Sequence, residues 1–450
     1  MTEKVDLLIK NGIVVTMDKE RRVFLDGAIA ILGNKIVAVG ETQKITSSYS
    51  GERVVDAKNK VVMPGLICSH AHTHGQAVMG MPYNIEEHDF YSELAKWWWP
   101  NLEDQLTKED VHRISRYSLG MMAKFGVTTV LDVMEAPKHL PGILDAEAEA
   151  YLDIGMRGVL AFEATERISK ENGKLGIQEN VDFIKKWNNK EDSLLRGMMC
   201  VHTVFSCSPD MLKEVREIAN ELKSGITLHV EESMYEVEYS KEHFGKLPFE
   251  HLRDIGFLGP DVLAAQVVNI SEKEIDILRE YGVKVAHNPM SNMEFGVGVS
   301  PVPKMLDKNV TVGLGNDGVE TMDMFEVMRF TYIVHKGVNK DTTLIPPMKA
   351  LEMATIENAK AIGWADKIGS IEVGKYADIT IVDLKGVTPI NEENIYYLIV
   401  ILGKGGKVTH TIVNGKIIAE NQKLLTFDEE KMVEDAYKAS TEIWKRDGFL

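Results

Sequence analysis

Eight apolar segments of strand length alternate with helical patterns through the middle of this 450-residue chain. Continuous apolar strands, each followed by a helix, are typical of a parallel sheet that is covered on both faces. Eight such units predict an α/β fold, a (β/α)8 TIM barrel, with its chemistry at the carboxyl ends of the strands. The segments are Met63–His70, 127–133, 155–164, 195–203, 225–232, 262–269, 283–289 and 310–318.

The intervening segments carry helix boundary signals. Thr107 is a candidate N-cap for the helix after the first strand, because its hydroxyl can accept a bond from a free backbone N–H. A later helix is predicted to start after Ser271 and to stop at Gly282. These signals support the alternation of strands and helices.

Two β-rich segments flank this region, at 1–62 and at 368–425, and both contain the Asn-Gly pairs that favour hairpin turns. Their matched character predicts that they form one small composite β-sandwich domain. The barrel would then occupy 63–367, and an amphipathic C-terminal helix would lie within 426–450.

Three histidines at alternate positions, His70, His72 and His74, close the first apolar segment. In a strand, residues i and i+2 point to the same side, so His70 and His72 can present two imidazoles to one cation. Gly75 suggests that the strand ends before His74 can extend the row. A loop with weak surface metal affinity is the alternative, but the position after a buried strand favours a true ligand pair.

Other polar residues fall at the ends of later segments: His202, His229, Gln266, His287 and Asp317. A buried histidine taken alone is more often a core residue than a ligand. The shared position at one end of a barrel favours a site instead. Asp317 could complete a His3Asp set with an open position for water, as catalytic metal sites require.

Glu232 lies three residues beyond His229, where the chain turns into the following helix. A carboxylate there could take a proton from a water that a metal activates, and return it to a leaving group. A solvated carboxylate at a helix start is the alternative. Glu231 and Glu236 cannot be ranked against Glu232 by spacing alone.

Composition limits the partners. The formal net charge of −17 argues against nucleic acid, and three cysteines without a paired motif argue against a disulfide framework. No window approaches the roughly 20 apolar residues that span a membrane, and the N-terminus does not read as a signal peptide. We therefore expect a cytoplasmic protein, acting on a small molecule as a homo-oligomer.

Several motifs together resemble the amidohydrolase superfamily, in its aminohydrolase and chlorohydrolase branch, which includes S-adenosylhomocysteine/methylthioadenosine deaminases and triazine hydrolases. The likeness spans nearly the whole chain. The motifs are PGLICSHAH, VHTVFSCSPDML, HVEE, HNPMSN, GLGNDG and IGSIEVGKYADITIVDL.

The resemblance implies the roles of the site residues. It assigns one divalent metal to His70, His72, His229 and Asp317, with Glu232 as general acid and base. The metal is expected to be zinc, with iron or manganese as alternatives. The substrate-binding residues are His202, Glu103 in the segment WWWPNLEDQLT, and His74 as an extra pocket residue, while Gln266 and His287 join Glu232 as catalytic candidates.

The chief departure from the family lies at strand six, where AAQVVN places Gln266 at the position of a family histidine. Glutamine can donate or accept a hydrogen bond but cannot carry a proton between pH 5 and 8. The side chain could still hold the attacking water, or it could read heteroatoms of another substrate.

The expected function is a metal-dependent hydrolase that deaminates a purine-like or other nitrogen heterocycle through a metal-bound hydroxide. The heterocycle could be an adenosine derivative, such as S-adenosylhomocysteine or methylthioadenosine, or a guanine-like compound. One alternative is a triazine-type chlorohydrolase or amine hydrolase, which Gln266 keeps open. Another is a ligand-binding relative that has lost catalysis.

Overall fold

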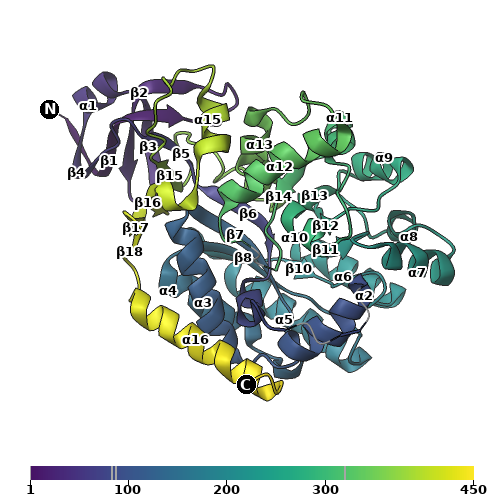
Figure 1. The fold of residues 1–450 in the computed structure, drawn as a ribbon. Coiled ribbons are helices and arrows are strands. Elements are labelled where there is room, and N and C mark those ends of the chain that lie inside the picture. Colours follow the sequence, from purple (N-terminus) through teal and green to yellow (C-terminus); the bar gives the residue numbers. More distant parts are fainter. Residues whose placement is uncertain (1, 83–84, 87–88, 319–320) are drawn as a thin grey trace.

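The computed structural model describes residues 2–82, 85–86, 89–318 and 321–450. Its central part is built from parallel strands that are buried along their length, with helices between them (Figure 1). One sheet has the order β6 (Leu66–Ala71), β7 (Val127–Met134), β8 (Arg157–Phe162) and β9 (Leu195–Gly197). A second has the order β10 (Met199–Cys200), β11 (Ile226–Val230), β12 (Val262–Gln266), β13 (Lys284–His287) and β14 (Val312–Leu314).

The two parallel sheets meet at their edges. Isolated parallel bridges join Ala71 to Asp317 and Ala164 to Val201. The predicted strand at 195–203 is divided, because β9 pairs with β8 whereas β10 pairs with β11. The chain therefore passes from one sheet to the other within this single segment.

Helices follow the strands as the sequence predicted. Thr107 caps α3 (Lys108–Lys124) in a reciprocal capping box with Asp110, and Ser271 does the same for α9 (Glu272–Tyr281) with Glu274. Gly282 ends α9 in the left-handed conformation. The other long helices are α4 (Ile143–Ile154), α5 (Lys170–Trp187), α6 (Pro209–Leu222), α7 (Met234–Phe244) and α12 (Met324–Asn339).

Strands from both ends of the chain share a mixed nine-stranded sheet (Figure 1). The two ends join where β5 pairs antiparallel with β15, with Val62 opposite Ile381. The N-terminal strands are β1 (Glu3–Val15), β2 (Val23–Leu32), β3 (Lys35–Glu41), β4 (Tyr49–Asp56) and β5 (Val61–Pro64). The C-terminal strands are β15 (Ile379–Val382), β16 (Val408–Val413), β17 (Lys416–Glu420) and β18 (Lys423–Leu424).

The chain leaves this sheet at Pro64-Gly65 and enters the parallel region at Leu66. Gly65 permits this because a Cβ there would lie 2.2 Å from Thr128 side-chain atoms. The first predicted strand, Met63–His70, is thus shared between two sheets. The sandwich arrangement and the domain limits remain predictions.

The C-terminal helix α16 (Glu429–Arg446) runs along α3. Arg116 of α3 donates to Asp435 of α16 at 2.7 Å, and Arg446 donates to Asp110 at 2.7 Å. No helix in the described ranges is long and apolar enough to cross a membrane.

Candidate active site

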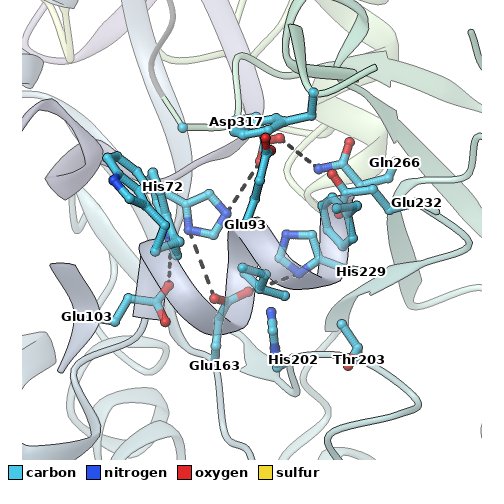
Figure 2. Close-up of a pocket in the computed structure, with 16 residues that line it drawn as sticks. His72, Glu93, Glu103, Glu163, His202, Thr203, His229, Glu232, Gln266 and Asp317 are labelled. Carbon is cyan, nitrogen blue, oxygen red and sulfur yellow. Dashed lines mark hydrogen bonds and ion pairs between the residues drawn. The ribbon is translucent and has the colours of Figure 1, made fainter. Parts of the chain in front are cut away.

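A cavity opens at the carboxyl ends of the parallel strands (Figure 2). The short helix α2 (Phe90–Glu93) and the π-helix η2 (Leu94–Glu103) form part of its wall. Most residues that the sequence singled out line this cavity: His72, Glu103, His202, His229, Glu232, Gln266 and Asp317. The fold therefore brings polar side chains from the ends of several strands, far apart in the sequence, into one cavity.

Three histidines and one aspartate converge at the base of the cavity. His70 Nε2 lies 3.0 Å from Asp317 Oδ1, and His72 Nε2 lies 3.4 Å from the same oxygen. His229 Nε2 lies 3.1 Å from His70 Nε2. One ligand atom from each of these four residues lies within 4.8 Å of the others, which is the arrangement of a His3Asp metal site.

Local backbone features bring Asp317 to His70. Gly315 lies so close to β6 that a Cβ would sit 2.6 Å from the His70 carbonyl oxygen. Asp317 itself has a left-handed φ of 55° and pairs across to Ala71. Such strained non-glycine conformations persist where the surrounding structure holds them, commonly at functional sites.

The electrostatics of His70 and Asp317 suit cation binding. Burial lowers the pKa of His70 to about 4, so this ring is neutral near pH 7 and keeps a lone pair. Burial would raise the pKa of Asp317, but hydrogen bonding to His70 and His72 holds it well below its usual range. Neutral imidazole and ionised carboxylate are the forms that bind metals.

Glu163 is a site residue that the sequence reading missed. It follows β8, is fully buried, and lies between His72 and His229 (Figure 2). Its carboxylate is 3.1 Å from His229 Nδ1 and 3.9 Å from His72 Nδ1. Burial alone would lower the pKa of His229, but Glu163 raises it to about 10. The one available signal was a glutamate at the end of the buried segment 155–164.

Glu232 lies in the cavity wall near Asp317 and is only 7% exposed. Burial, followed by the charge of Asp317, raises its pKa well above the ordinary value. A carboxyl group with a raised pKa can hold and pass on a proton near neutral pH. Glu231 and Glu236, its sequence neighbours, do not line the cavity.

Gln266 is fixed at both ends of its amide. Its Nε2 donates to Asp317 Oδ2 at 2.8 Å, and its Oε1 accepts from Asn292 Nδ2 at 2.6 Å. Gln266 and Val267 both have positive φ, 76° and 50°. The amide retains one N–H and one lone pair for a water or a substrate.

The opposite wall carries Glu103 and His202. Glu103 is 1% exposed and accepts a hydrogen bond from Trp98 Nε1 at 2.6 Å. Burial lowers the pKa of His202 to about 3, and its Nδ1 lies 3.3 Å from Ser206 Oγ. Both groups can therefore accept hydrogen bonds or contact a ring in the cavity.

His74 and His287 do not line the cavity. His74 is fully buried, with its ring centroid 5.7 Å from that of His72, and neither ring nitrogen has a hydrogen-bond partner within the described part of the chain. His287 faces α12, where its Nε2 lies 3.1 Å from His335 Nε2.

Comparison with known proteins agrees with this architecture. Residues 61–418 match the sequence model of the Amidohydrolase family. The chain is 36% identical to a 5'-deoxyadenosine deaminase of Methanosarcina barkeri, covering 98% of this chain and 99% of that protein. It is 35% identical to a 5-methylthioadenosine/S-adenosylhomocysteine deaminase of Thermoanaerobacter pseudethanolicus, covering 98% and 100%.

Among solved structures, an adenosine deaminase from Xanthomonas campestris with bound zinc superimposes with a TM-score of 0.91. The two chains are 25% identical, and the match covers 99% of this chain and 100% of that one.

Proposed function

This chain belongs to the amidohydrolase family, and from that premise we propose that it deaminates an adenosine-type nucleoside at a site holding one divalent metal ion, zinc. The observation that carries the proposal is the convergence of His70, His72, His229 and Asp317 beside Glu232. The names of the relatives and of the zinc-containing neighbour support the substrate and the metal.

The residues present fit such an ion. Three imidazoles and one ionised carboxylate form the donor set. His229 Nε2 and His70 Nε2 lie 3.1 Å apart, and two ring nitrogens at this distance require either a proton between them or a cation that both bind. A divalent ion held there would lower the pKa of a water molecule and polarise the ring carbon under attack.

Glu232 is proposed to move the protons. The water oxygen bonds to the ring carbon that carries the amino group, the C–N bond breaks, and ammonia leaves. Glu232 takes a proton from the water and delivers it to the departing nitrogen, which its raised pKa suits. Gln266 orients Asp317 by its hydrogen bond and offers its remaining N–H to the water or the heterocycle.

Glu163 is proposed to position two of the ligands. A carboxylate near Nδ1 of His72 and of His229 favours the tautomer with the proton on Nδ1, which leaves each Nε2 free for a metal. His202 and Glu103 are proposed to contact the substrate from the opposite wall. His74 and His287 are not used, since they lie outside the cavity.

We also propose that the two parallel sheets close into a (β/α)8 barrel, and that the mixed sheet folds as a sandwich built from both chain ends. The edge bridges Ala71–Asp317 and Ala164–Val201 support closure. The β5–β15 pairing supports the composite domain.

The test is ammonia release from 5′-deoxyadenosine by zinc-loaded protein, with metal content measured alongside. Wild type should release one ammonia per nucleoside. Glu232→Gln should lose at least about 100-fold in kcat while keeping its metal, because only the proton carrier is removed. Glu231→Gln is the matched control, since Glu231 is buried next to Glu232 but does not line the cavity. Full activity in Glu232→Gln would refute the proton role.

A further inference from the structure

We infer that this site selects nucleosides whose 5′ end carries no negative charge, an inference that rests on the proposed function. Five carboxylates line the cavity: Glu93, Glu103, Glu163, Glu232 and Asp317. Among the described residues, no lysine or arginine lines it. The described wall therefore offers many acceptor oxygens and no lysine or arginine that could pair with an anion.

The guanidinium of Arg167 does not change this balance. Arg167 lies behind Glu103, 3.5 Å from its Oε2, and is already paired with Glu135 and with Asp104, the latter at 2.8 Å. Its charge also sits over the ring of Trp99, 4.7 Å from the centroid. The Arg167 guanidinium is thus already neutralised by the carboxylates of Glu135 and Asp104 in the absence of substrate.

The residues outside the described ranges include no lysine or arginine. Positions 83–84, 87–88 and 319–320 hold Tyr-Asn, Glu-His and Val-Glu, and position 1 holds Met.

A substrate carboxylate would lose its water in this cavity and find no lysine or arginine among the described lining residues to pair with, which is costly. The divalent ion of the proposed function would be held by His70, His72, His229 and Asp317 and would activate the attacking water, so we do not expect it to pair with the 5′ end of the substrate. Hydroxyl and amine donors fit better, because Glu103 Oε2 is buried and accepts no hydrogen bond within the described part of the chain.

This lining distinguishes three candidate substrates within the proposed class. A 5′-deoxy or 5′-methylthio group is neutral, whereas the homocysteine end of S-adenosylhomocysteine is a zwitterion. Its ammonium can donate to the acceptors of the wall, but its carboxylate finds no lysine or arginine among the described lining residues. We therefore assign the first two as substrates in preference to the third. Both kinds of compound appear in the names of the relatives, so overall similarity does not decide between them.

The experiment compares two nucleosides that differ in little besides charge, adenosine 5′-carboxamide and adenosine 5′-carboxylate, with 5′-deoxyadenosine as the reference. We expect kcat/KM for the carboxamide to exceed that for the carboxylate by about 100-fold or more. Similar values for the pair would overturn the inference and leave the proposed function standing. No ammonia from any of the three would overturn the proposed function, and the inference with it.

A charge-reversal variant tests the cause. Glu93→Lys places a cation on the cavity wall and should narrow the carboxamide-to-carboxylate ratio at least about tenfold. Glu238→Lys makes the same change of net charge at an exposed position of α7 that does not line the cavity, and should leave the ratio unchanged. An unchanged ratio in Glu93→Lys, or an equal shift in both variants, would overturn the assignment to the cavity wall.

Discussion

At the scale of single residues, Glu163 links two candidate ligands through their second ring nitrogens. Glu163→Ala should lower zinc affinity about 10- to 100-fold, the usual effect of removing a carboxylate that orients ligating histidines. Glu163→Gln should lose less, because its amide oxygen can still accept from Nδ1–H. The measurement is zinc affinity by chelator competition, independent of turnover.

Glu166→Gln is a suitable control for Glu163, since Glu166 lies three residues on and bonds to the Ser208 backbone N–H instead. Equal zinc affinity in Glu163→Ala and wild type would show that the carboxylate does not position the histidines.

Gln266 carries the second prediction at this scale. Its amide binds Asp317 and Asn292, so it is too well fixed to be a bystander. Replacement by histidine would present a ring of different shape and donor pattern to the substrate. We therefore expect Gln266→His to change the rank order of kcat/KM over adenosine-type, guanine-type and triazine substrates.

Metal content serves as the control for this experiment, because Gln266 is not among the candidate ligands. An identical rank order in wild type and Gln266→His would contradict a role in specificity and leave Gln266 as a residue that holds Asp317 or the water.

Site residues that belong to a local sequence pattern could be predicted, and site residues outside such a pattern could not. His70 and His72 were predictable because a strand has a period of two, and the histidines flank its end. Glu163 has no such motif. Its role depends on contacts to His72 and His229, which are distant in the chain, and only the fold brings them together.

At the scale of elements, β7 holds the loop that follows His72. Asp132 of β7 accepts hydrogen bonds from the backbone N–H of Thr73 at 3.0 Å, from its hydroxyl at 2.6 Å, and from the Tyr151 hydroxyl at 3.0 Å. Glu147 of α4 is buried beside Asp132, and burial together with that charge raises the pKa of Glu147 well above 4.5.

This buried carboxyl group predicts a pH dependence of stability. Because folding raises the pKa of Glu147, its contribution is fully present below the unfolded value of about 4.5 and is lost as pH rises toward the folded value. Glu147→Gln stays neutral throughout. Its thermal midpoint relative to wild type should therefore increase as pH rises from about 5 to 8.

Thermal unfolding of wild type and Glu147→Gln across that range checks this. Glu149→Gln on the exposed side of α4 is the matched control and should follow wild type. Parallel curves for Glu147→Gln and wild type would mean that Glu147 does not take up a proton on folding.

Element existence was also more predictable than element boundaries. Apolar runs bounded by helix caps showed where the parallel strands lie, since burial on both faces demands such runs. The exchange of partners between β9 and β10, and the sharing of Met63–His70 between two sheets, depend on long-range pairing. The local sequence does not indicate which distant strands pair with one another.

At the scale of the whole molecule, a buried ion pair connects the parallel region to the nine-stranded sheet. Arg157 of β8 has no exposed surface and donates to Asp378, just before β15, at 2.7 and 3.1 Å. It also donates to Asn414 Oδ1 at 3.2 Å, and its guanidinium lies 4.4 Å from the ring centroid of Tyr376. The two parts of the chain thus share a buried charge.

Breaking this pair should weaken the connection between the two sheets. Asp378→Asn leaves the Arg157 guanidinium buried without its counter-charge, and removal of one partner of a buried pair typically costs about 3–5 kcal/mol. Replacing both residues, as in Arg157→Met with Asp378→Asn, removes the unpaired charge and should recover part of the loss. Urea unfolding of the full-length protein, followed by near-ultraviolet circular dichroism, measures both effects.

If Asp378→Asn unfolded at the same urea concentration as wild type, the Arg157–Asp378 pair would contribute nothing to joining the two parts. A double variant less stable than the single one would show that packing by Arg157, rather than its charge, makes the connection.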